Sequence, residues 1–195
     1  MKSENVETYI SVDIEASGPI PGEYSMLSIG ACVVKDRAKT FYVELQPIND
    51  NFIPEALAVS KFDLERLKTT GLPAVVAITQ FATWIKQVAI EGSPVFVGFN
   101  ACFDWAFVNW YFHKYTNSNP FGIGGIDIKA FYMGLSGSLW SQTRSSRLPN
   151  EFKGTSPHTH NALDDARAQG EIFHKLLLSS VNRTESVPAN QKGLS

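Results

Sequence analysis

The sequence predicts an α/β fold in which helices flank a mixed central β-sheet. Three strand-like segments come first along the chain, and a helix, a short apolar strand, a second helix and a closing helix follow them. Strands joined by short turns pair antiparallel, whereas a buried strand between helices usually pairs parallel. We therefore expect an antiparallel meander joined to parallel strands. At 195 residues the chain has the length of one domain, which we place at residues 1–180, with a polar, flexible tail at 181–195.

The three N-terminal strands are predicted from runs of β-branched and aromatic residues. The first strand lies in Thr8–Gly18, where Ser17-Gly18-Pro19 ends it. The second spans Ser25–Val34 and the third spans Thr40–Leu45, with the charged segment 35–39 as the turn between them. These segments form the predicted meander.

The rest of the chain alternates helical periodicity with short strands. We expect helical pieces at Glu55–Leu67, a helix at Ala74–Ile90, a strand at Pro94–Asn100, a helix at Phe103–Tyr115, a brief strand at Ile126–Ile128, a helix at Lys129–Leu135, a long mobile loop at Ser136–Pro157 and a closing helix at Asn161–Ser180.

Composition excludes several classes of protein. A net charge of −2 and a pI near 6.1 disfavour a protein that coats long nucleic acids. The sequence has no apolar run of the roughly 18 residues that a membrane span needs, so no membrane association is expected. The polar N-terminus does not resemble a signal peptide, and Cys32 and Cys102 are predicted to be buried free thiols. These features favour a cytoplasmic protein.

The first strand carries two acids on one face. Side chains alternate along a strand, so Asp13 and Glu15 point to the same side, roughly 6.6 Å apart. Two like charges on an otherwise apolar strand repel each other unless a cation lies between them. The pair predicts either a divalent metal site or two ordinary acids at a solvent-facing strand end.

The closing helix places a second acid near the core. Its apolar stripe leaves Asp164 on the surface and brings Asp165 to the edge of the buried face. His160 lies five residues before Asp165. His160 could cap the helix and Asp165 could pair with Arg167, or both could belong to a site.

A further acid, Asp104, directly follows the mid-chain apolar strand, so the chain offers four carboxylates and one imidazole in a fixed order. Carboxylates suit Mg²⁺ or Mn²⁺, and two such ions about 3.5–4 Å apart form the clamp used for phosphoryl transfer.

With these parts the sequence resembles the DnaQ-like family of 3′→5′ exonucleases, in its DEDDh branch, which has the RNase H-like fold. The resemblance covers roughly residues 8–180 and rests on VDIEASG, VGFNACFDWAF and HNALDDA. It implies two Mg²⁺ ions, replaceable by Mn²⁺, on Asp13, Glu15, Asp104 and Asp165, with His160 deprotonating the attacking water. It also implies that Ala16, Ser17, Gly18, Asn100 and Phe103 contact the terminal nucleotide.

We expect release of 5′-mononucleotides from single-stranded 3′ ends, with RNA slightly favoured over DNA. Degradation of very short oligonucleotides and a non-catalytic nucleic-acid-binding module are the alternatives, and homodimers among relatives make a homodimer a further expectation. Phe99 stands where many members carry His, which leaves open how the terminal nucleotide is contacted.

Three other features are ambiguous in the sequence. Asp127 could assist the site or cap a helix. The Trp140–Lys153 segment could hold a single strand by stacking and charge, or could be a solvated loop. His158 rivals His160 as the base, but His160 immediately precedes the helix that carries Asp165, which favours His160.

Overall fold

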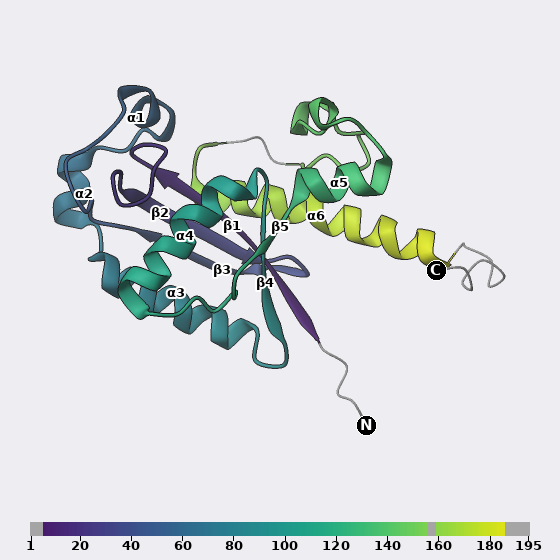
Figure 1. Cartoon of the computed structure of the whole chain (residues 1–195), viewed down its shortest axis with the longest axis horizontal. Helices are drawn as coiled ribbons and strands as arrows, with labels where there is room; N and C mark the ends of the chain where they lie inside the picture. Colours follow the sequence, from purple (N-terminus) through teal and green to yellow (C-terminus); the bar gives the residue numbers. More distant parts are fainter. Residues whose placement is uncertain (1–5, 156–158, 186–195) are drawn as a thin grey trace.

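A five-stranded mixed sheet forms the centre of the computed structural model, which describes residues 6–155 and 159–185 (Figure 1). The strand order is β3-β2-β1-β4-β5. β1 pairs antiparallel with β2 and parallel with β4, so the predicted meander and parallel strands are confirmed. The strands are β1 (Glu7–Ala16), β2 (Met26–Val33), β3 (Asp36–Glu44), β4 (Ser93–Gly98) and β5 (Gly125–Asp127).

The turn between β2 and β3 is shorter than predicted. β3 begins at Asp36, which pairs with Val33, so the connection is Val34-Lys35 and the charged residues 36–39 belong to the strand. β3 lies at an edge of the sheet, where charged side chains remain in water and discourage pairing with another strand. Charge alone was therefore a poor sign of a turn.

Helices cover both faces of the sheet. α5 and α6 lie on one face, and α3 and α4 lie on the other (Figure 1). None of the described helices is long and apolar enough to cross a bilayer. The helices are α1 (Pro54–Ser60), α2 (Leu64–Thr70), α3 (Ala74–Val88), α4 (Ala101–Thr116), α5 (Ile128–Ser136) and α6 (Ala162–Glu185), with 3-10 turns η1 (Trp140–Gln142) and η2 (Ser145–Arg147).

Two predicted boundaries are wrong. The loop at 136–157 contains η1 and η2, and the buried side chains of Thr143 and Leu148 fasten it to the protein. α6 continues to Glu185, beyond the predicted end of the closing helix at Ser180, so residues 181–185 are helical. Residues 186–195, and 156–158 within the loop, lie outside the described part of the chain.

The alternation of β1 divides the apolar core from the polar face. Ile10, Val12 and Ile14 are buried in the cluster shared with α3 and α4. The alternate residues of β1, including Asp13 and Glu15, face α6, as the strand period predicts. A second apolar cluster, under α5 and α6, includes Val97, Ile128 and Phe173.

α6 approaches the sheet closely where β2 carries a glycine. A Cβ atom on Gly30 would lie 2.1 Å from the carbonyl carbon of Ala162, in the first turn of α6. Any side chain at this position would push the helix start away from the sheet. Gly30 therefore allows the acids at the start of α6 to reach β1.

The two cysteines differ in exposure. Cys32 is buried under α6, as predicted, whereas Cys102 is exposed. α4 buries Ala101, Asp104 and Phe107, which are spaced three residues apart, so Cys102 lies off the buried face. An apolar sequence context did not reveal this helical phase.

Candidate active site

The site forms where β1 extends beyond β4. β1 pairs with β4 only as far as Ser11, which lies opposite Val97, and β4 ends at Gly98. The backbone N–H of Ile14 therefore has no strand partner on that side. Instead it donates to Oδ1 of Asp104 at 3.0 Å, from the first turn of α4. The Asp104 carboxylate is thereby fixed between Asp13 and Glu15 of β1.

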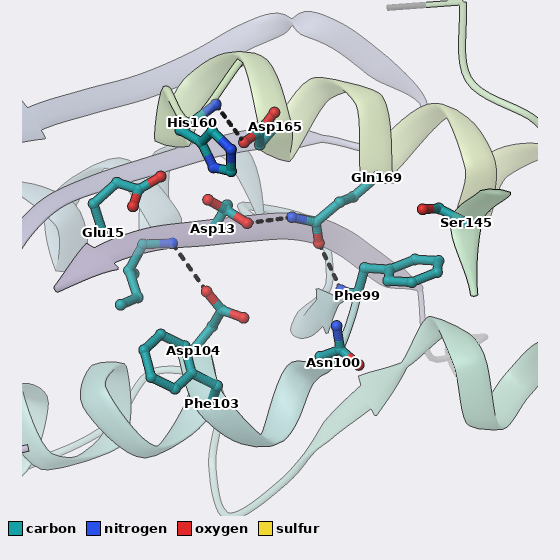
Figure 2. A pocket seen from close by; sticks show the side chains of 11 residues that line it. Asp13, Glu15, Phe99, Asn100, Phe103, Asp104, Ser145, His160, Asp165 and Gln169 are labelled. Carbon is teal, nitrogen blue, oxygen red and sulfur yellow. Dashed lines mark hydrogen bonds between the residues drawn. The ribbon is translucent and has the colours of Figure 1, made fainter. Parts of the chain in front are cut away.

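A glutamine on α6 fixes the first acid of β1. Gln169 is 2% exposed, and its side-chain amide donates to Oδ1 of Asp13. Its carbonyl oxygen accepts from the backbone N–H of Phe99 at 2.6 Å. Gln169 thus ties the Asp13 carboxylate to the turn between β4 and α4 (Figure 2).

Asp165 organises the chain that enters α6. Its two carboxylate oxygens accept backbone N–H groups from Thr159 and His160, each at 3.1 Å. His160 has a left-handed backbone, with φ of 55°, which is uncommon for a residue other than glycine. The Asp165 carboxylate stabilises this conformation and so sets the direction of the imidazole.

Neighbouring residues cap α6 and pair with Arg167, which were the alternative roles considered for His160 and Asp165. Asn161 caps α6, because its Oδ1 accepts from the N–H groups of Leu163 and Asp164. Arg167 pairs with the exposed Asp164 at 3.7 Å. Asp165 is 4% exposed, so the predicted division between a surface acid and a buried acid is confirmed.

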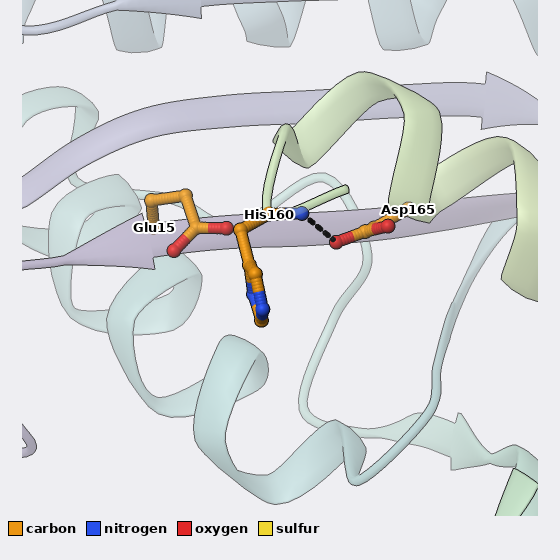
Figure 3. Close-up of side chains that lie close together, drawn as sticks. All are labelled: Glu15, His160 and Asp165. Carbon is orange, nitrogen blue, oxygen red and sulfur yellow. Dashed lines mark hydrogen bonds between the residues drawn. The ribbon is translucent and has the colours of Figure 1, made fainter. Parts of the chain in front are cut away.

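These elements enclose an open cavity of about 340 Å³. Glu15, His160 and Asp165 each offer a ligand atom, and these atoms lie within 4.8 Å of one another (Figure 3). The cavity is lined by Asp13, Ile14, Glu15, Phe99, Asn100, Phe103, Asp104, Ser145, His160, Asp165 and Gln169.

The carboxyl groups oppose one another's ionisation. Burial and the charge of Asp165 raise the pKa of Glu15 to about 7. Burial raises the pKa of Asp104 to about 8, although its bond from Ile14 acts in the opposite direction. Burial, followed by the charges of Asp104, Glu15 and Asp165, raises the pKa of Asp13 well above its usual range. Divalent cations would relieve this repulsion, and the donor set suits Mg²⁺ or Mn²⁺.

The structure brings together seven of the ten predicted site residues. Ala16, Ser17 and Gly18 do not line the cavity. The buried Ser17 hydroxyl donates to the carbonyl of Asn51 and accepts from the N–H of Ser25, so it is already bonded within the protein. Asp127 accepts from the backbone N–H of Ala130 and caps α5, as one of its two predicted roles requires. His158 lies outside the described residues.

Gln169 and Ser145 line the cavity but were missed in the sequence. Gln169 follows Asp165 by four residues, so the two share a helix face, and a polar residue on a buried face was an available signal. Ser145 belongs to η2, where the sequence shows no periodicity that could have identified it.

Comparisons with known proteins agree with this geometry. A family model described as "Exonuclease" (RNase_T) matches residues 10–173. The 3′-5′ DNA exonuclease Cap18 of Escherichia coli is 51% identical over 168 residues, which cover 86% of this chain and 90% of that protein. The nuclease domain of 3′hExo, a DEDDh member bound to rAMP, has a TM-score of 0.69 at 13% identity, over 87% of this chain and 91% of that one. The chain belongs to the RNase_T family and is a 3′→5′ exonuclease.

The RNase H-like fold of this exonuclease recurs in larger proteins. E. coli Exonuclease I in complex with a dT13 oligonucleotide has a TM-score of 0.69 at 13% identity, over 92% of this chain and 43% of that one. The cell-death related nuclease CRN-4 has a TM-score of 0.64 at 18% identity, over 88% of this chain and 64% of that one. DEDDh exonucleases depend on divalent metals, which fits the acidic donor set found here.

Metal-free stability should fall as pH rises. Folding raises the pKa of Glu15 from 4.5 to about 7 and that of Asp104 from 3.8 to about 8, so the folded state holds protons that the unfolded state has released. In EDTA we expect a Tm roughly 5 °C lower at pH 8 than at pH 5.5, and recovery with Mg²⁺ at pH 8. Calorimetry of wild type and Asp13→Asn checks this, because the variant should show a smaller decrease. Equal Tm values for metal-free wild type at both pH values would contradict the prediction.

Loss of the Gln169 amide should weaken metal binding. Gln169→Met keeps the side-chain length but removes both hydrogen bonds, so the Asp13 carboxylate is no longer oriented. Groups that orient metal ligands typically change metal affinity by about 10–100-fold. Calorimetric Mn²⁺ titration should show that loss, and the more exposed Glu171→Gln on the same helix should match wild type. Wild-type affinity in Gln169→Met would remove Gln169 from this role.

Proposed function

We propose that this protein removes 5′-mononucleotides one at a time from single-stranded DNA 3′ ends, with Asp13, Glu15, Asp104 and Asp165 holding two Mg²⁺ ions. The observation that carries the proposal is the convergence of these four carboxylates and His160 at the end of β1. Residues separated by some 150 positions in the chain meet in one cavity. If Asp13 and Glu15 were ordinary surface acids, no residues from other elements would need to lie beside them.

The ions, replaceable by Mn²⁺, would supply positive charge at the scissile phosphate and the leaving oxygen. The protein residues fix the geometry around them. Ile14 orients Asp104 and Gln169 orients Asp13 through hydrogen bonds from N–H donors. Each bond leaves further lone pairs on the carboxylate, so orientation does not prevent metal binding.

His160 is proposed as the general base. Its imidazole is exposed beside Glu15 and opens onto the cavity, so a ring nitrogen can accept the proton of an attacking water (Figure 3). The bond from its backbone N–H to Asp165 keeps the ring next to the acids.

Phe103 and Asn100 are proposed to contact the terminal nucleotide. The Phe103 ring is 41% exposed at the cavity and rests on Phe107 at a centroid distance of 5.3 Å, so its free face can stack on a base. Ser17 donates its N–H to Ser25 and its carbonyl accepts from Ile53. The Ser17 hydroxyl is also bonded within the protein. We therefore propose that the Ala16–Gly18 turn supports the terminal-nucleotide pocket from behind.

DNA is proposed as the substrate because Cap18, at 51% identity, is named a DNA exonuclease. This differs from the slight preference for RNA drawn from the sequence. All five site residues remain in place and converge, which disfavours a binding module without catalysis. Cleavage of strands of several lengths separates the proposed activity from one restricted to very short oligonucleotides.

Removing the His160 imidazole should slow hydrolysis of 5′-labelled single-stranded DNA by about 10²–10⁴-fold, while Mn²⁺ binding is largely kept. Asp164→Ala is the matched control in the first turn of α6, just after His160, and its rate should stay within about tenfold of wild type. Gel analysis of labelled DNA and RNA, with and without Mg²⁺, measures these rates. Faster turnover of RNA would overturn the DNA assignment, and a His160→Ala rate equal to that of Asp164→Ala would overturn the base assignment.

A further inference from the structure

An exposed tryptophan beside the cavity has no role in the proposed chemistry. Of the four tryptophans, all within the described residues, Trp140 is the exposed one, with 54% of its surface accessible. The neighbouring Leu139 is 70% exposed. Large apolar side chains in water are common singly, so exposure alone indicates nothing about Trp140. Its contacts are more informative.

Trp140 is connected to the cavity through one lysine. The ammonium of Lys129 lies 4.1 Å from the Trp140 ring centroid, and it also donates to Oδ1 of Asn100 at 2.7 Å. Asn100 lines the cavity. An ammonium has three N–H donors, so Lys129 keeps capacity for an anionic ligand while it contacts Trp140 and Asn100.

The positions of Lys129 and Asn100 are fixed by Asp127. One carboxylate oxygen of Asp127 accepts from the N–H of Ala101 at 2.7 Å, at the start of α4. The other accepts from Ala130 at 2.8 Å, at the start of α5. The same carboxylate therefore binds both helix starts, which holds Asn100 and Lys129 side by side.

The Trp140 turn is also anchored. The buried Thr143 hydroxyl donates to the carbonyl of Trp140 at 2.8 Å and closes the η1 turn. Further along the loop, after η2, Leu148 is buried against the cluster under α5 and α6. Ser145, between them, lines the cavity. The loop thus lines the cavity at Ser145 and holds the indole next to Lys129, which contacts Asn100 at the edge of the cavity.

Charge distinguishes the segment that carries Trp140 from the acidic part of the cavity. Residues 129–155, of which Ser145 lines the cavity, carry four basic residues and one acid, Glu151, whereas β1, α4 and α6 bring the carboxylates into the cavity. Figure 2 places Phe99, Asn100 and Ser145 on one side of the cavity, with Glu15 and His160 on the other. A chain of phosphates that leaves the acidic part of the cavity is attracted toward this basic segment, whose Lys129 contacts Asn100 at the cavity. The basic residues are Lys129, Arg144, Arg147 and Lys153.

We propose that Trp140 and Lys129 form a subsite for the nucleotide on the 5′ side of the scissile phosphate. The exposed indole stacks on the base of that nucleotide, and the ammonium of Lys129 binds its phosphate. This inference rests on the proposed function, because that function places the terminal nucleotide at Phe103 and the cleaved bond between the two contacts. This subsite allows the enzyme to bind single strands without a broad basic surface.

Strand affinity tests the subsite without turnover. In a His160→Ala background with Mg²⁺, anisotropy of a short 5′-fluorescein oligo(dT) should show about tenfold weaker binding for Trp140→Ala. Trp140→Phe should bind within about twofold of the parent, because a stacking ring remains. Leu139→Ala, which removes the exposed neighbour, should bind like the parent. Equal affinities for the parent and Trp140→Ala would overturn the proposal.

A strand with an abasic second nucleotide from its 3′ end locates the contact. The parent should bind this strand about tenfold more weakly, and Trp140→Ala should cause no further loss. With the abasic position at the third nucleotide the Trp140→Ala loss should persist. If Trp140→Ala weakened binding of the strand with an abasic second nucleotide as much as it weakens binding of the intact strand, the assignment of this position would be overturned.

The role of Lys129 is tested by one substitution that removes its charge and by another that keeps the charge. Lys129→Met should weaken strand binding and lower the salt dependence by about one phosphate contact, whereas Lys129→Arg should restore much of both. Lys86→Met, on the opposite face of the sheet in α3, is the control for lost charge and should match the parent. An equal effect of Lys129→Met and Lys86→Met would overturn the role of Lys129.

Turnover separates this subsite from the chemistry. In the active protein Trp140→Ala should raise KM for oligo(dT) about tenfold with kcat within about twofold. Hydrolysis of the p-nitrophenyl ester of thymidine 5′-monophosphate, which has no nucleotide in that position, should be unchanged. Equal losses on both substrates would overturn the subsite. Failure of wild type to cleave oligo(dT) would overturn the proposed function, while the affinity comparison would still decide the subsite.

Discussion

Repulsion among four partly or fully buried carboxylates at the end of β1 is the constraint on which the rest of the structure depends. Asp13, Glu15, Asp104 and Asp165 come from three separate elements, and burial with mutual charge raises the pKa of the first three. Such a cluster is unfavourable in a folded protein unless cations bind to it. Three of these acids, Asp13, Asp104 and Asp165, are nevertheless held in place by the Gln169 amide and by N–H donors of Ile14, Thr159 and His160. A protein that holds mutually repelling acids in this way is organised to bind cations.

The fold provides this arrangement through two local mismatches. β1 extends beyond its pairing with β4, so the backbone N–H of Ile14 can donate to Asp104. Gly30 lets the first turn of α6 lie against β2, so Asp165 reaches the same end of the sheet. The polar face of β1 therefore meets both helices at one point. The same edge carries Asn100, which lines the cavity and accepts a hydrogen bond from Lys129.

Much of this arrangement could be predicted from sequence, because it depends on local periodicity. Strand alternation placed Asp13 and Glu15 on one face, and helix phase separated Asp164 from Asp165. Contacts between distant elements could not be read in this way. Gln169 bonds to residues 70 and 156 positions away, and the buried hydroxyl of Ser17 bonds to the Asn51 carbonyl 34 positions away. The η1 and η2 turns depend on where Thr143 and Leu148 are buried, which has no periodic signal.

The central claim is that these carboxylates act together as a site for divalent cations. Calorimetric titration of Mn²⁺ into the metal-free protein tests it most directly, with Asp13→Asn, Asp104→Asn and the exposed Asp164→Asn compared under the same conditions. We expect two ions per chain for wild type and for Asp164→Asn, and the loss of at least one ion in each of the other two variants. Wild-type stoichiometry and affinity in both Asp13→Asn and Asp104→Asn would contradict the account.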